Sequence, residues 1–198
     1  MEKFATHKIG LDDYITGNRF IDICEETGAT FCKTDYIHQH SQVGKKVFVT
    51  HNSDYSITRQ VYENCPSHCH WFAQNNECQQ DSVTSIPIGL ENMLLRTSAA
   101  AAGGQFSSQV PGALHKAETI DRFANLQLLK NDLVYMNFNI KTHPEERQRV
   151  WDEFVEKDWV TSTSNLSMDH FYFDLASHKF VISPRGNGLD CHRTWEAL

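Results

Sequence analysis

The feature that most constrains this chain is an alternation of short apolar runs and helical segments in its C-terminal part. Apolar, β-rich runs occur at 133–137, 159–162 and 180–183, and helical signatures occupy 144–157 and 167–178 between them. Strands that alternate with helices across short connections pair in parallel, with right-handed crossovers. The pattern therefore predicts an α/β fold with a parallel sheet here. We expect the run at 180–183 to be a buried strand.

A second group of predicted strands lies earlier in the chain. Runs typical of short buried strands occupy 30–33, 46–50, 71–75 and 83–92, while 19–24 fits either a strand or the start of a helix. A stretch of small residues separates this group from an amphipathic helix predicted at 113–130. The pattern therefore predicts an α/β domain at 1–96, a flexible loop or linker at 97–112 and a second α/β domain at 113–198.

Composition excludes several classes of function. The 198 residues are 40% hydrophobic and carry a net charge of −7, so neither a nucleic acid nor an anionic membrane is favoured as a partner. No apolar run approaches the roughly 20 residues that span a bilayer, and the first residues have no signal-peptide core. We expect a soluble, cytoplasmic chain with reduced thiols, in which Cys24, Cys32 and Cys191 are small buried residues.

The end of the chain predicts an anion-binding site. A strand closes at Pro184, a turn follows at 185–188, and the residues from Asp190 onward suit a helix with Asp190 as its N-cap. Unpaired backbone N–H groups and the positive end of the helix dipole then point at whatever occupies the turn. We expect Gly186 and Gly188, which flank Asn187, to free the turn from steric limits on φ.

The helix side chains fit the same use. His192 and Glu196 lie four residues apart on one face, with Arg193 beside them, and Cys191 belongs to an apolar stripe on another face. Together with Arg185, the two basic side chains are placed to meet a diphosphate. Glu196 is placed a turn further in, where a carboxylate can accept hydrogen bonds from two neighbouring sugar hydroxyls.

The sixteen-residue run from Ser183 to Leu198, Ser-Pro-Arg-Gly-Asn-Gly-Leu-Asp-Cys-His-Arg-Thr-Trp-Glu-Ala-Leu, resembles the nucleotide-sugar signature of exostosin-like glycosyltransferases. These are family 47 and its viral, bacterial and algal relatives, including xylosyltransferase-type members. The resemblance implies the GT-B architecture, in which two Rossmann-type domains face a cleft, with the acceptor-side domain at 1–96 and the nucleotide-sugar-binding domain at 113–198. It also implies that the helix glutamate, here Glu196, contacts the donor's ribose. It covers Val47 to Leu198 and is firm over the last twenty residues. Family members continue with another strand, so we expect an incomplete second domain.

Two further groups follow predicted strands. His51 and Asp54 come after the strand at 46–50, where Ser53 or Asp54 fits the N-cap of a helix through Ile57. The resemblance favours a site instead, in which Asp54 or His51 takes the proton of an acceptor hydroxyl. The second group follows the strand at 133–137 and fits either caps and surface ion pairs or a flank of the donor phosphates; its members are Asn137, Asn139 and Arg147.

A cluster of metal-ligating residue types has irregular spacing. Structural zinc is usually held by two short-spaced pairs of Cys or His. Here Cys65, Cys69 and His70 are followed by Cys78 alone, so we predict no metal site and keep a zinc-stabilised interaction domain as a weaker alternative.

The resemblance implies a glycosyltransferase that moves a sugar from a nucleotide-sugar donor, a UDP-sugar, onto a glycan hydroxyl. It implies inversion at the anomeric carbon and no metal or other cofactor, because basic side chains and a helix N-terminus neutralise the leaving diphosphate. The alternative is a catalytically inactive, truncated transferase that acts as a glycan- or nucleotide-binding module.

Overall fold

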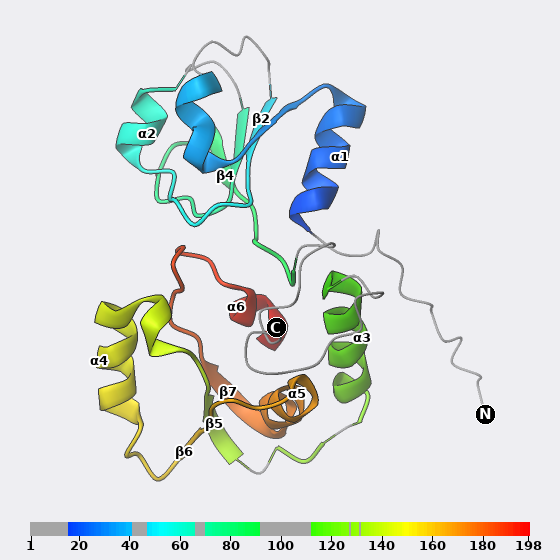
Figure 1. The fold of residues 1–198 in the computed structure, drawn as a ribbon, viewed down its shortest axis with the longest axis vertical. Coiled ribbons are helices and arrows are strands. Elements are labelled where there is room, and N and C mark those ends of the chain that lie inside the picture. Colours follow the sequence, from blue (N-terminus) through cyan, green and yellow to red (C-terminus); the bar gives the residue numbers. More distant parts are fainter. Residues whose placement is uncertain (1–15, 41–46, 66–69, 92–111, 127, 131) are drawn as a thin grey trace, which may run out of the picture.

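The computed structural model describes residues 16–40, 47–65, 70–91, 112–126, 128–130 and 132–198. These residues form a mixed α/β arrangement with two parallel sheets, one in the upper and one in the lower part of Figure 1. The α/β class and the parallel pairing predicted from the sequence are confirmed. The predicted linker, except for its last residue, lies outside the described residues. None of the helices in the described ranges combines the length and the apolar character that a membrane crossing requires.

The first sheet holds four strands in the order β1-β2-β3-β4. These are β1 (Thr30–Cys32), β2 (Val47–Thr50), β3 (His70–Ala73) and β4 (Val83–Ser85), and all pair in parallel. The run at 19–24 is helical, because it belongs to α1 (Gly17–Thr27). Thr16 caps the start of α1 by accepting a hydrogen bond from the Arg19 backbone at 3.1 Å, and Gly28 ends the helix with φ 72°.

The helix after β2 begins later than we predicted. Neither Ser53 nor Asp54 caps it; α2 (Arg59–Glu63) starts after Thr58, whose hydroxyl accepts the Val61 backbone N–H at 3.3 Å. Ile57 pairs with Asn76 in an isolated parallel bridge, which requires extended backbone and so delays the helix. A 3-10 helix, η2 (Thr34–His40), follows β1.

The core of the first sheet is built around Trp71. This side chain is buried, and its indole N–H donates to the Thr50 hydroxyl at 2.9 Å. Apolar side chains from the four strands and from the loops that follow them surround it, namely Cys32, Phe48, Ile57, Ala73, Cys78 and Val83. The prediction that Cys24 and Cys32 are buried is confirmed, and burial raises the pKa of Cys32 to about 11, with further contributions from Cys65 and Asp35.

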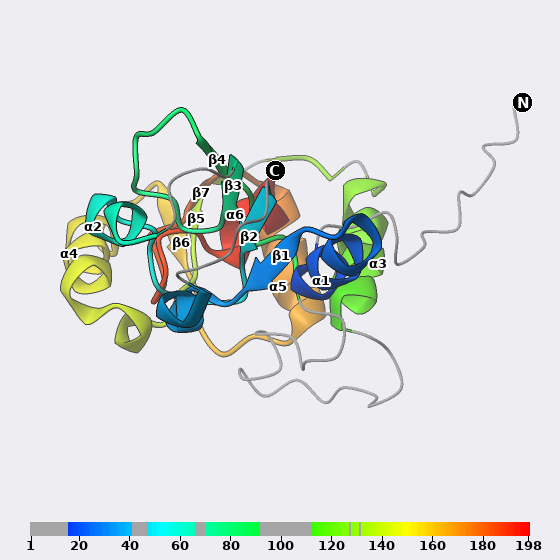
Figure 2. The same ribbon diagram turned by 90° about the horizontal axis from the view of Figure 1, so that it is seen from above.

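The second sheet has the order β6-β5-β7. Its strands are β5 (Asp132–Met136), β6 (Val160–Ser162) and β7 (His178–Ile182), linked by η4 (Ile140–Thr142), α4 (Pro144–Phe154) and α5 (Met168–Ser177). The helices α3 (Gly112–Ala124) and α5 lie on one side of this sheet and α4 on the other (Figures 1 and 2). A last helix, α6 (His192–Ala197), follows β7. The predicted alternation of strands and helices is therefore confirmed.

Several boundaries and burial predictions in the second sheet are wrong. α3 ends at Ala124 rather than at 130. Just after this end, the Asn125 side chain donates to the Asp121 carbonyl and carboxylate at 2.8 and 3.0 Å. α4 ends at Phe154 rather than at 157. Phe180 is 64% exposed, although His178 of the same strand is buried. Of the three consecutive aromatic residues in α5, the first two are buried and Phe173 is exposed.

Candidate functional site

The two sheets meet along a polar seam, which we define as the contacts between residues 74–91 and residues 188–196. The Asp190 carboxylate accepts the Ile88 backbone N–H at 2.7 Å. The Asp190 backbone N–H donates to the Asn75 side chain at 2.7 Å. The His192 Nδ1–H donates to the Gly89 carbonyl at 2.7 Å, so the segment after β4 is bonded directly to the start of α6.

These contacts correct the predicted role of Asp190. Cys191 occupies the N-cap position of α6, and it makes no side-chain cap hydrogen bond. The Asp190 carboxylate instead accepts the Trp195 indole N–H at 2.8 and 3.0 Å as well as the Ile88 N–H. Its negative charge is thus used to hold the seam. Cys191 itself is only partly buried, which differs from the prediction.

The seam lies where parallel sheets usually bind ligands. Asn75 follows the carboxyl end of β3, the Ile88 segment follows β4, and residues 183–191 follow the carboxyl end of β7. In open α/β sheets the ligand crevice lies beyond the carboxyl ends of the strands. The contacts of Asp190 and His192 therefore bring loops from these ends of both sheets together.

The second sheet also contains a topological switch point. The chain starts at the central strand β5, goes to β6 on one side and then crosses to β7 on the other. At such a point the loops that follow the two strands leave in opposite directions, which is where open α/β sheets usually bind their ligands. Asn137 and Asn139 follow β5, and Arg185 follows β7, so the structure brings these three predicted residues to one place.

Arg147 lies between these two loops. It is 8% exposed, and it donates from Nε to the Arg185 carbonyl at 2.7 Å and from Nη1 to the Asn139 carbonyl at 2.8 Å. A longer contact of 3.4 Å joins Nη2 to the Pro184 carbonyl. Burial, together with the neighbouring charge of Arg193, lowers the pKa of Arg147. Arg147 thus fixes the two loops to each other, and its burial is at odds with the surface ion pair that was one of its two interpretations.

The two asparagines are also engaged within the protein. Asn137 donates from Nδ2 to the Tyr135 hydroxyl at 3.1 Å and to the Thr163 hydroxyl at 3.0 Å. The Asn139 side chain caps η4 by accepting the Lys141 backbone N–H at 3.0 Å. The cap interpretation is therefore correct for Asn139.

The turn requires glycine at position 188 for a different reason from the one we predicted. The left-handed φ values among the described glycines belong to Gly28 and Gly89, not to Gly186 or Gly188. A Cβ atom at Gly188 would lie 2.7 Å from the Asn75 amide nitrogen, so this position needs glycine because the two halves of the seam approach closely. Asn187 is exposed, and its carbonyl accepts from Arg185 Nη2 at 3.2 Å.

Arg193 is the most distinctive cation of the site. Its guanidinium carbon lies 4.6 Å from the centre of the Phe171 ring. Within the described part of the chain, its Nε and Nη1 are buried without a hydrogen-bond partner, as is the Nε of Arg185. A buried donor left unpaired costs about 1–3 kcal/mol. Two such guanidinium groups beside one turn are therefore poised to donate to an anion.

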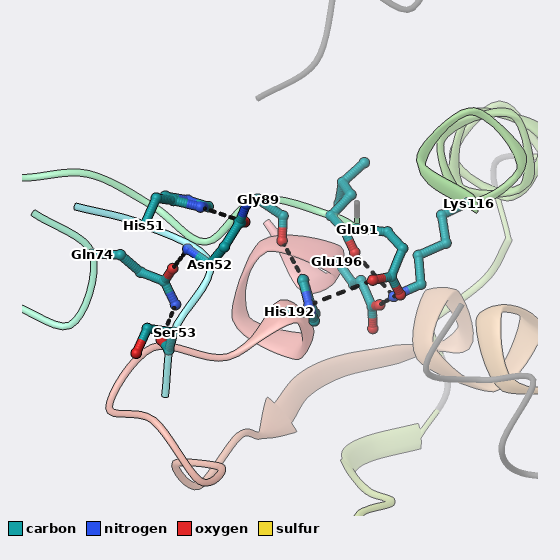
Figure 3. A network of polar contacts seen from close by, with 10 residues as sticks. His51, Asn52, Ser53, Gln74, Gly89, Glu91, Lys116, His192 and Glu196 are labelled. Atoms are coloured by element: carbon teal, nitrogen blue, oxygen red, sulfur yellow. Dashed lines mark hydrogen bonds and ion pairs between the residues drawn. The ribbon is translucent and has the colours of Figure 1, made fainter. Parts of the chain in front are cut away.

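Glu196 belongs to a buried ionic group that sequence reasoning missed. The Lys116 ammonium is fully buried and lies 2.6 Å from Glu196 Oε1, 3.2 Å from Glu91 Oε2 and 3.0 Å from the Leu90 carbonyl. His192 Nε2 lies 3.8 Å from Glu91 Oε1 (Figure 3). Burial would raise the pKa of Glu196, but the charge and hydrogen bond of Lys116 hold it below its usual value.

His51 is placed differently from Asp54. The imidazole is 1% exposed; its Nε2 lies 2.9 Å from the Pro87 carbonyl and its Nδ1 lies 3.0 Å from the Asn52 side-chain oxygen. Because both ring nitrogens are engaged, His51 is not presented to an acceptor hydroxyl. The neighbouring Gln74 bonds the backbone of Asn52 and Ser53, as Figure 3 shows. Asp54 is exposed at the end of this loop.

His51 is expected to make the fold sensitive to acid. Burial lowers its pKa below 6.5 and outweighs the hydrogen bonds, which raise it. The folded state then binds fewer protons than the unfolded state below that pH, so the free energy of unfolding falls as the pH drops through 6.5, by at most about 1.4 kcal/mol per pH unit. Urea unfolding between pH 8 and 5, on the wild type and on His51→Asn, measures this slope.

The matched control is His170→Asn, which removes an exposed imidazole. We expect the control to keep the wild-type slope and His51→Asn to flatten it. Equal slopes in all three proteins would show that His51 titrates alike in the folded and unfolded states.

The zinc alternative gains no support from the described residues. No group of three or more His, Cys, Asp or Glu side chains in the described ranges is arranged to hold a metal ion. Cys78 is buried in the apolar core, and His70 Nε2 contacts the Thr84 hydroxyl at 2.9 Å. Cys69, however, lies outside the described residues.

Comparison with known proteins gives no family for this chain. No family model matches it, and no curated protein matches it significantly.

Proposed function

We propose that this chain is a glycosyltransferase of the exostosin-like, GT-B type that transfers a sugar from a nucleotide-sugar, a UDP-sugar, to a glycan hydroxyl. The observation that carries the proposal is that Arg193 has two buried nitrogens, Nε and Nη1, without a hydrogen-bond partner among the described residues, and lies close enough to the Glu196 carboxylate to lower its pKa. A nucleoside diphosphate needs both kinds of group, because it carries an anionic end and a ribose diol.

The leaving diphosphate is assigned to the basic turn. Arg193 and Arg185 supply the N–H donors that lack protein partners among the described residues. Fixed donors in a water-poor site stabilise the charge that develops on a leaving diphosphate, and such stabilisation is often the largest part of catalysis. His192 is excluded from this role by its contact with Gly89, so the predicted trio of basic side chains becomes a pair.

The ribose is assigned to Glu196. A carboxylate offers about four lone-pair positions on its two oxygens, and one hydrogen bond from Lys116 leaves acceptor capacity for a vicinal diol. Because Lys116 holds the pKa of Glu196 low, the carboxylate stays ionised at neutral pH. An ionised carboxylate accepts hydrogen bonds from both hydroxyls of a diol.

The proton acceptor is assigned to Asp54. An inverting transfer needs a group that takes the proton of the acceptor hydroxyl. Asp54 is exposed beyond the carboxyl end of β2, whereas His51 is buried with both ring nitrogens engaged. Of the two predicted bases, we therefore retain Asp54.

Release of nucleoside diphosphate from a panel of UDP- and GDP-sugars tests the proposal. We expect slow hydrolysis by the wild type and faster release with an accepted glycan. Glu196→Gln keeps the shape but weakens acceptance from the diol, so kcat/KM should fall by about tenfold, a loss typical of one hydrogen bond to a charged group. Glu118→Gln, at an exposed position of α3, is the control and should retain full activity.

One observation favours the binding-module alternative: both ring nitrogens of His51 are engaged. This leaves Asp54 as the remaining candidate, of the two predicted, for the base that deprotonates the acceptor hydroxyl. A module would bind nucleotide or glycan and release no diphosphate from any donor. Binding without turnover, in a chain shown to be folded, would therefore replace the transferase proposal.

A further inference from the structure

We propose that Lys116 is a positioning residue for the ribose contact, and that it couples Glu196 to the segment 86–91 through Glu91. This inference rests on the function proposed above. It concerns three side chains that lie far apart in the sequence and meet at one buried ammonium group.

The geometry makes Lys116 a junction between three segments. From α3 its ammonium bonds Glu196 of α6 at 2.6 Å and Glu91 of the segment after β4 at 3.2 Å. The Leu90 carbonyl, at 3.0 Å, adds a second contact to that segment. The side chain of Lys116 is 0% exposed and both carboxylates are 6% exposed, so water screens these charges little.

The segment 86–91 is itself tied to α6 on either side of this junction. Ile88 bonds Asp190, and Gly89 bonds His192. A movement of Glu91 therefore changes the partner of Lys116 and, through it, the direction and charge of the Glu196 carboxylate. The first sheet, which delivers segment 86–91 through β4, thus influences the residue that receives the ribose.

Removing the ammonium would change how Glu196 titrates. Like charges in a shared buried site cannot both stay ionised, so one carboxylate takes up a proton near neutral pH. The charged or titratable groups that face this pair are Lys116 from α3, Tyr172 from α5, and His192 and Arg193 from α6. A protonated Glu196 accepts hydrogen bonds poorly, so ribose binding would become dependent on pH.

Calorimetric titration with UDP at pH 6, 7 and 8 tests this inference. We compare each variant with the wild type at the same pH, because the UDP phosphate itself titrates with a pKa of about 6. For Lys116→Met we expect a Kd about tenfold above the wild-type value at pH 6 that approaches the wild-type value at pH 8, a change that a merely structural role would not produce. Lys116→Arg, which restores the charge, should recover the wild-type profile, and Lys141→Met, at an exposed position, is the control.

Glu91→Gln provides a second test if Lys116→Met does not fold. It removes the negative charge of Glu91 that competes with Glu196 for Lys116, so Lys116 binds Glu196 more strongly and weakens it as an acceptor; we therefore expect the Kd for UDP to rise about threefold. A Kd unchanged in Glu91→Gln, or raised equally at every pH in Lys116→Met, would overturn the inference while leaving the function intact. Absence of UDP binding by the wild type would instead refute the proposed function, and this inference with it.

Discussion

Replacing Arg147 with methionine is expected to lower the free energy of unfolding by about 2–4 kcal/mol. The guanidinium is buried and donates to the carbonyls of Arg185 and Asn139 at 2.7 and 2.8 Å, with a weaker contact to Pro184. A hydrogen bond from a charged donor contributes about 1.5–3 kcal/mol, and its loss leaves partly buried carbonyls without a partner. Urea unfolding followed by circular dichroism measures the change.

Arg149→Met is the matched control, because Arg149 lies on the same helix but is exposed. Its substitution should change stability by less than about 0.5 kcal/mol. We also expect Arg147→Met to weaken nucleotide binding, because the turn at 185–188 loses its anchor. A variant as stable as the control would mean that the two loops of the switch point are held by other contacts.

Replacing Arg193 with methionine is expected to raise the Kd for UDP by about 10- to 100-fold, the range set by one or two charge-assisted hydrogen bonds. Its Nε and Nη1 have no hydrogen-bond partner within the described residues, so the folded protein loses no internal hydrogen bond at these two atoms. The substitution also removes the cation–π contact with Phe171, which costs about 0.5–2 kcal/mol of stability, and the attraction between Arg193 and Glu196.

Arg122→Met controls for the loss of one positive charge. Arg122 forms an exposed ion pair with Asp169 and stacks on Phe123. It therefore makes a cation–π contact of its own, as Arg193 does, but it lies outside the proposed donor site. We expect this variant to bind UDP as the wild type does. If both variants bind equally well, the unpaired nitrogens of Arg193 do not receive the diphosphate, and the donor-site assignment fails.

The local sequence pattern was sufficient for the elements that position the site. The alternation after residue 132 predicts the parallel pairing of β5, β6 and β7, since each short apolar run has a helix between it and the next. It also places Asn137 and Arg185 at the ends of strands. These ends lie close together because β5 and β7 are neighbours at the topological switch point. The predicted helix boundaries were less accurate. The side-chain hydrogen bond of Asn125 at the end of α3 and the β-bridge of Ile57 before α2 set the real boundaries, and helical periodicity contains no information on such contacts.

The contacts between the sheets were not predictable from local patterns. Asn75 and Asp190 are 115 residues apart, and Lys116 and Glu196 are 80 apart, so no window of sequence contains both partners. One signal was available: Lys116 lies between Ala113 and Ala117, which are buried, on the inner face of a predicted amphipathic helix. A lysine on such a face must find a buried carboxylate, because burying an unpaired charge is too costly.

Tertiary contacts also changed the roles of residues that local rules had assigned. Asp190 has the residue type of an N-cap, but its carboxylate is taken by Ile88 and Trp195. Gly188 has the residue type of a left-handed turn, but it is needed because Asn75 packs against it. Both changes arise from the seam between the sheets, which is also where the proposed ligand binds.

Calorimetric titration of the wild-type chain with UDP, GDP and their sugars is the first test for a nucleotide-sugar site at the seam. We expect saturable binding of a nucleoside diphosphate, selective for one base, that is weakened in Arg193→Met and in Glu196→Gln. Absence of binding to every member of the panel, by a chain whose circular dichroism shows it to be folded, would contradict the proposal that the seam is a nucleotide-sugar site.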